Sequence, residues 1–152
     1  MSSRRETAVN AFMQGYNCAQ SIAVAFADVT DLPKDTLVSL AAPFGGGMGR
    51  LREVCGVFSG SLAVLGLLEG YATPETGEKK KALYRDVQTL AKAFEEKRGT
   101  LICRNILGLE PGHDEPEPAE RTPEYYASRP CAGCIGDMAD ILEAFLKEKG
   151  IL

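Results

Sequence analysis

The sequence has one histidine, no tryptophan, and no apolar run long enough to cross a membrane. A single histidine excludes metal motifs that need two histidines on one helix, and it argues against a Cys–His catalytic pair. That histidine, His113, lies in an acidic stretch, where we expect it to be solvated. The longest uncharged segment, residues 54–68, is shorter than the roughly 20 residues of a spanning helix. The two arginines near the N-terminus precede no apolar segment, so we expect no secretory signal and a cytoplasmic location.

Positive charge is also scarce. The 152 residues include 17 Lys and Arg against 21 Asp and Glu, a net charge of −4, and the only basic cluster is the short run 79–81. Nucleic-acid binding normally needs a basic stripe or patch, so we expect no nucleic-acid partner. The length and the hydrophobic content of 45% suit one domain with its own core, which we place over residues 1–152.

Glycine, proline and helix-capping residues divide the chain into helices, and no segment is convincing as a strand. The longest amphipathic face carries Leu83, Val87, Leu90 and Phe94, at helical spacing. We predict an all-α fold, a single compact domain of about six to seven helices, with an acidic, proline-rich loop at 108–123. The expected helices cover residues 7–13, 34–42, about 51–71 and 73–99, together with a helix starting at Cys18, a short one around Cys103, and a last one running from near Pro130 to Gly150.

Five cysteines are spread along this chain, and four of them, Cys18, Cys55, Cys103 and Cys131, stand where a helix is expected to begin. A helix N-terminus carries partial positive charge and free N–H groups, which stabilise a thiolate. In a reducing compartment such a set favours metal binding or thiol exchange over stable disulfides, and the odd number agrees. The alternative is that the cysteines are small core residues.

Glycines accompany these cysteines. The segment 45–49 lacks the Gly-Lys-Ser/Thr of a phosphate-binding loop and follows no strand, but its N–H groups could donate to sulfur. Gly56 and Gly60 lie inside an expected helix, where each glycine destabilises the helix by about 1 kcal/mol relative to alanine. Close approach of another helix or of a cofactor beside Cys55 would explain that cost. The candidate cofactor-contacting glycines are Gly45, Gly46, Gly47, Gly56 and Gly60.

Cys131 and Cys134 form a CxxC motif. Ile135 stands where covalent haem attachment needs histidine, and no βαβ unit supports a thioredoxin-like site. The pair could be a redox dithiol, or one member could be a metal ligand. Zinc ribbons use two such pairs, so the spacing does not favour zinc.

Three motifs combine these cysteines with particular neighbours: Gly15-Tyr-Asn-Cys-Ala-Gln20, Pro43-Phe-Gly-Gly-Gly-Met-Gly49, and Val54-Cys-Gly56 with Gly60. With Cys103 and Cys131, they resemble a family of redox-active proteins named for their cysteine pattern, C-GCAxxG-C-C. The resemblance covers nearly the whole chain, and its four cysteines correspond to Cys18, Cys55, Cys103 and Cys131. The sequence departs from the pattern at Val57, where alanine is usual, in the acidic insert, and in having Cys134 as an extra cysteine.

A related domain occurs in the split-Soret cytochromes, where an iron–sulfur centre has been inferred beside haem. The resemblance therefore implies a redox-active protein that binds an iron–sulfur cluster or another metal through Cys18, Cys55, Cys103 and Cys131, for electron transfer or redox sensing. A metal-free thiol–disulfide oxidoreductase and a structural helical module remain open as alternatives. The sequence does not identify the redox partner, and homodimerisation is compatible with each alternative. The metal hypothesis requires the sulfurs to meet in one pocket.

Overall fold

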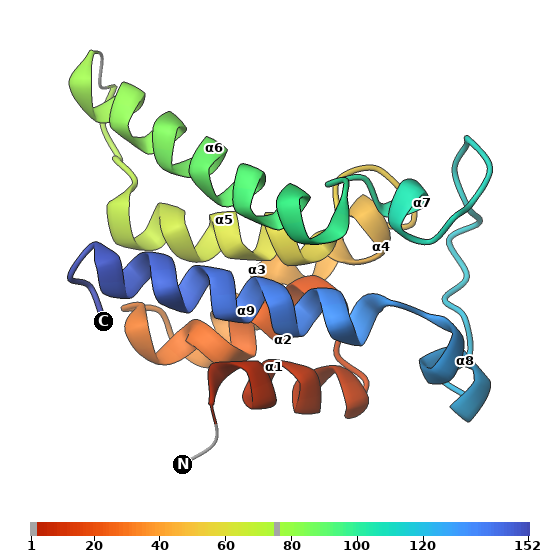
Figure 1. Ribbon diagram of the computed structural model, residues 1–152. Coiled ribbons are helices and arrows are strands. Elements are labelled where there is room, and N and C mark those ends of the chain that lie inside the picture. Colours follow the sequence, from red (N-terminus) through yellow and green to blue (C-terminus); the bar gives the residue numbers. More distant parts are fainter. Residues whose placement is uncertain (1–2, 75–76) are drawn as a thin grey trace.

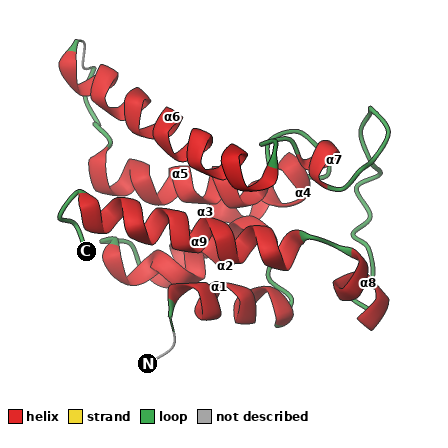
Figure 2. Cartoon of the chain, in the orientation of Figure 1, coloured by secondary structure: helices red, strands yellow, loops and turns green. Residues whose placement is uncertain are grey.

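The computed structural model describes residues 3–74 and 77–152, and within them the chain is built from helices and loops (Figure 2). The only β pairing in these residues is an isolated antiparallel bridge between Val54 and Ile102. The predicted all-α class is therefore confirmed. The helices are α1 (Arg4–Met13), α2 (Cys18–Phe26), α3 (Lys34–Ala41), α4 (Gly45–Met48), α5 (Gly56–Glu69), α6 (Glu78–Arg98), α7 (Cys103–Ile106), α8 (Pro123–Ser128) and α9 (Cys131–Glu148), with 3₁₀ turns at Ala27–Val29 and Ala42–Phe44.

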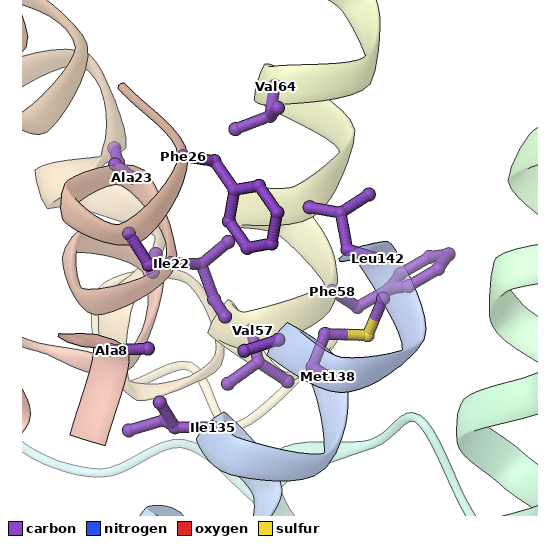
Figure 3. Packing of buried hydrophobic residues seen from close by; sticks show 14 of the residues in the cluster. Ala8, Ile22, Ala23, Phe26, Val57, Phe58, Val64, Ile135, Met138 and Leu142 are labelled. Carbon is purple, nitrogen blue, oxygen red and sulfur yellow. The ribbon is translucent and has the colours of Figure 1, made fainter. Parts of the chain in front are cut away.

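Helix α2 occupies the centre of the molecule and packs against α1, α3, α5 and α9. Helix α6 lies across α5 and α9, and the short helices α4, α7 and α8 gather at the end where α9 begins (Figure 1). The core is one cluster of side chains to which α1, α2, α3, α5, α6 and α9 contribute. Within it Ile22, Phe26, Val57, Met138 and Leu142 are fully buried (Figure 3). No helix in the described residues combines the length and hydrophobicity that crossing a bilayer requires.

Two helix starts follow directly from local sequence. At α2 the Asn17 side chain accepts a hydrogen bond from the Gln20 N–H at 2.8 Å, and the Gln20 side chain accepts one from the Asn17 N–H at 3.2 Å. This reciprocal capping box fixes Cys18 as the first helical residue. Ser3 and Glu6 form the same arrangement, so α1 begins at Arg4 rather than at the predicted residue 7.

Two long helices begin later than predicted. Residues 51–55 pair with the segment before α7 instead of extending α5: the Cys55 N–H donates to the Leu101 carbonyl at 2.7 Å, and the Cys103 N–H to the Glu53 carbonyl. Helix α6 begins after Gly77, whose φ of 70° is not helical, and not at Thr73. The predicted first-turn residue Glu75 lies outside the described residues.

Helix α8 was not predicted, although its start has ordinary signals. Thr122 caps it by accepting from the Tyr125 N–H at 3.1 Å, and Pro123 is its first residue. With six residues and no buried side chain, α8 lacks the apolar periodicity by which longer helices are recognised. Helix α9 begins directly after Pro130 and its chain turns at Gly150, both as predicted.

Candidate functional site

Each cysteine of the family pattern stands at a helix start. Cys18, Cys103 and Cys131 are the first residues of α2, α7 and α9, and Cys55 is the residue before α5. Cys134 lies one turn into α9. The predicted placement of four cysteines at helix starts is confirmed. All five are free thiols.

The structure brings all five cysteines to one cavity of about 60 Å³, a volume that admits water or a small inorganic group. Most of its accessible lining is apolar. Residues from α2, α5, α7 and α9 meet there, so the site exists only once these elements pack. The cysteines share this lining with Phe12, Asn17, Gly46, Arg52, Val57, Ile106, Leu107, Arg121, Tyr125 and Arg129.

Glycines allow the cysteine-bearing elements to approach so closely. A Cβ at Gly56 would overlap the Cys18 sulfur, and one at Gly47 would lie 2.6 Å from the Cys103 Cβ. A Cβ at Gly60 would lie 2.7 Å from the Ala19 carbonyl oxygen, so this glycine serves the contact between α5 and α2. Of the five glycines proposed to contact a cofactor, Gly46 lines the cavity, and Gly45 lies against the Asn17 side chain. Their contact with a cofactor stays a prediction.

The segment that follows these glycines is strained. Met48, Arg50 and Arg52 all have left-handed backbone conformations, with φ of 69°, 68° and 59°. Each such residue costs on the order of 1 kcal/mol or more and persists only where its surroundings hold it. The Glu53 N–H donates to the Gly47 carbonyl at 3.0 Å, which holds the loop curled. The left-handed conformation of Arg52 directs its side chain toward Cys103.

Arg52 is 3% exposed, and its Nη1 lies 3.6 Å from the Cys103 sulfur. Its Nε donates to the Asp114 carboxylate at 2.7 Å, and this hydrogen bond holds the pKa of Asp114 below its usual range. Asp114 belongs to the acidic loop at 108–123 and is exposed, yet its carboxylate also anchors this loop to the cysteine site. The neighbouring His113 is largely exposed, with its Nε2 3.6 Å from Glu53.

Burial dominates the ionisation of the thiols. It raises the pKa of Cys18, Cys55 and Cys134, and it raises the pKa of Cys131 to about 12. The Gly46 N–H donates to the Cys18 sulfur and opposes the shift there without reversing it. Helix starts alone therefore do not make these groups thiolates, contrary to the expectation from sequence, because desolvation outweighs the favourable N–H groups.

No three histidine, cysteine, aspartate or glutamate side chains in residues 3–74 and 77–152 are grouped as ligands of a single metal ion. The donor set nevertheless suits a thiophilic group, since thiolates are the usual ligands of iron–sulfur clusters. The cysteines are therefore of the chemical type that such a cluster needs, but their present spacing does not surround a single metal ion.

Two residues that sequence reasoning missed, Arg121 and Tyr125, line the cavity on the α8 side. Arg121 donates to the carbonyl oxygens of Phe12 and Tyr16, both at 3.1 Å, and its guanidinium lies 4.5 Å from the Phe12 ring centroid. Tyr125 also receives the Arg121 guanidinium over its ring, at 5.1 Å. The contacts of Arg121 with Phe12 and Tyr16 join segments more than 100 residues apart, so no local pattern could reveal them.

A family model described as "Putative redox-active protein (C_GCAxxG_C_C)" matches residues 16–145. The chain belongs to this family, and the resemblance seen in the sequence is confirmed. No curated protein and no solved structure matches the chain.

Proposed function

We propose that the protein binds an iron–sulfur cluster through Cys18, Cys55, Cys103 and Cys131 and serves in electron transfer or redox sensing. The observation that carries the proposal is that four cysteines remote in sequence line one small, mostly apolar cavity as free thiols. A structural module would have no reason to gather them, and membership of a redox-active family supports the same chemistry.

Among the described residues no three ligating side chains are grouped around one point, and this spacing is compatible with a cluster, whose ligands need not meet at a single ion such as zinc. Ligand sulfurs around one ion must all lie within bonding distance of the same point. Those of a cluster bind different iron atoms and are spaced more widely. A cavity whose cysteines share a wall without converging on one point is suited to the larger group.

The surrounding residues would govern what such a cluster does. It would supply one-electron redox chemistry, whose potential depends on hydrogen bonds to sulfur and on solvent exposure. Arg52 donates toward the Cys103 sulfur and the Gly46 N–H toward the Cys18 sulfur, so both would stabilise added negative charge. Phe12, Val57 and Tyr125 limit the access of water. Because burial raises the pKa of Cys18, Cys55 and Cys131 and so keeps these thiols protonated, uptake of iron must release protons and is favoured at higher pH.

The test compares two cysteine variants after anaerobic purification, with iron and acid-labile sulfide measured per chain. Cys55→Ser should lose most of both. Cys134→Ser is the matched control, since Cys134 lines the same cavity and is also buried but lies outside the family pattern. It should keep them. Full iron content in Cys55→Ser, or no iron in the wild-type protein, would contradict the proposal.

One observation favours a second function, metal-free thiol–disulfide exchange. Cys131 and Cys134 are one helical turn apart and line the same cavity. This function predicts a reversible two-electron couple that Cys134→Ser abolishes and that does not depend on iron. Titration in thiol redox buffers of stated potential therefore separates the two functions.

A further inference from the structure

A second cavity, of about 390 Å³, opens beside the cysteine cavity, and we call it the vestibule. The two share six lining residues, so a molecule in the vestibule would stand next to the cysteine site. The vestibule is bordered by α4 and the residues after it, by the proline-rich segment before α8, and by α8 with the residue that follows it. Its lining residues are Asn17, Gly45, Gly46, Gly49, Arg50, Arg52, Pro116, Pro118, Ala119, Arg121, Tyr125 and Arg129.

Four of these residues are arginines, and among the described lining residues none is acidic. This is unusual in a chain with net charge −4. Asp114 offsets part of the charge from outside the lining, at 2.7 Å from Arg52 and 3.6 Å from Arg50. Arg121 donates only to carbonyl and hydroxyl oxygens, so its positive charge is not neutralised.

Arg129 is the least satisfied of the four. It is partly buried. Its backbone N–H donates to the Tyr125 carbonyl at 3.2 Å, but within the described part of the chain its side chain makes no hydrogen bond or ion pair, and its charge acts on Asp114 only through space. Its guanidinium lies 4.8 Å from the centroid of the Tyr125 ring, which orients the group while leaving its N–H donors free. A fixed guanidinium with free donors is suited to bind a carboxylate or phosphate group in a bidentate manner.

We propose that the vestibule binds a small anion carrying at least two carboxylate or phosphate groups, held by Arg129, Arg121 and Arg50. The volume is within the range of small-molecule sites. Several arginines with one carboxylate partner leave enough positive charge for a dianion. Bound there, the anion would lie between solvent and the cysteines, in the position of a substrate, an electron partner or a gate. The proposal does not depend on an iron–sulfur cluster.

Calorimetric titration with citrate and with pyrophosphate tests the site, in metal-free and in iron-containing protein at constant ionic strength. The two probes carry carboxylate and phosphate groups, and so distinguish which chemistry the arginines prefer. Arg129→Gln should weaken binding by about 10-fold or more, the loss of one charge-assisted contact. Arg129→Lys, which keeps the charge but loses the fork, should weaken it less.

Arg85→Gln is the control for charge alone, because Arg85 is an exposed arginine of α6 outside the vestibule. It should leave the affinity unchanged, and circular dichroism should show that every variant is folded. The proposal is overturned if neither probe binds more strongly than chloride, or if Arg85→Gln and Arg129→Gln weaken binding equally. Iron content is measured separately, so failure of anion binding and failure of cluster binding are distinguishable.

Discussion

Replacing Gly60 by alanine should destabilise the protein, although alanine is the better helix former. Gly60 lies in the middle of α5, where its Cα faces the backbone of α2. An added Cβ would lie 2.7 Å from the Ala19 carbonyl oxygen and 3.1 Å from the Ala19 Cα. Both are backbone atoms of a central helix, so no side-chain rotation relieves the overlap. The two helices would have to separate.

Two opposing effects set the size of the change. Alanine in a helix interior gains about 1 kcal/mol over glycine. Overpacking a well-filled contact costs typically 1–3 kcal/mol, and here the contact is between two backbones, so we take about 3 kcal/mol. The expected net loss is about 2 kcal/mol in the free energy of unfolding. For a chain of this length that corresponds to a fall in Tm of roughly 4–8 °C.

Gly66→Ala is the matched control in the same helix. A Cβ at Gly66 would meet nothing within 4 Å, so only the gain in helix propensity remains. This variant should be more stable than wild type by up to about 1 kcal/mol. Urea denaturation followed by circular dichroism measures both variants. If Gly60→Ala proves as stable as Gly66→Ala, close packing of α5 on α2 is not the reason for the glycine.

Three further predictions follow from the ionisable groups. Burial raises the pKa of Cys131 to about 12 from the ordinary 9.0. Because only the thiolate reacts, iodoacetamide should modify Cys131 of the metal-free protein near neutral pH roughly 1000-fold more slowly than it modifies an exposed cysteine. Peptide mapping that finds Cys131 labelled at the ordinary rate would refute this. Folding favours the protonated thiols of Cys18, Cys55, Cys131 and Cys134, whose pKa is raised in the folded state. Their contribution to the stability of reduced, metal-free protein should therefore be fully present below about pH 9, and the free energy of unfolding should fall above it by up to ~1.4 kcal/mol per pH unit for each group. Equal urea midpoints at about pH 8 and about pH 10 would contradict this prediction. Asp114→Asn should lower the urea midpoint only modestly, because that carboxylate is 40% exposed and its ion pair with Arg52 is screened by water. Asp31→Asn, at an exposed turn, should lower the midpoint less in the same denaturation assay.

Local signals predicted those parts of the fold that local interactions determine. Asn17 with Gln20 marks the start of α2, and Pro130 marks the start of α9, because a cap or a proline acts within one helical turn. The start of α5 was placed wrongly for the converse reason. Residues 51–55 have no local obstacle to helix, and they are drawn out of it by hydrogen bonds to residues about 50 positions later.

The candidate site divides in the same way. Helix starts and glycines identified the four family cysteines, and the family pattern implied that they act together. The contribution of Arg52 depends on a left-handed backbone conformation that is uncommon for arginine, and that of Arg121 on carbonyls in another part of the chain. Neither depends on a nearby pattern, so a single sequence could not disclose them.

Cys134 shows what the fold adds to a motif. By family pattern it is a surplus cysteine, yet the helical turn between it and Cys131 directs it into the same cavity, where it is 1% exposed. If the four family cysteines bind the proposed cluster, the buried thiol of Cys134 gives the site a group that can replace a ligand or form a disulfide with Cys131 when the metal is lost. Cys55→Ser therefore tests ligation, while Cys134→Ser tests whether the site survives oxidation. Loss of reversibility after oxidation in Cys134→Ser, with normal iron content beforehand, would assign the fifth cysteine a protective role separate from metal binding.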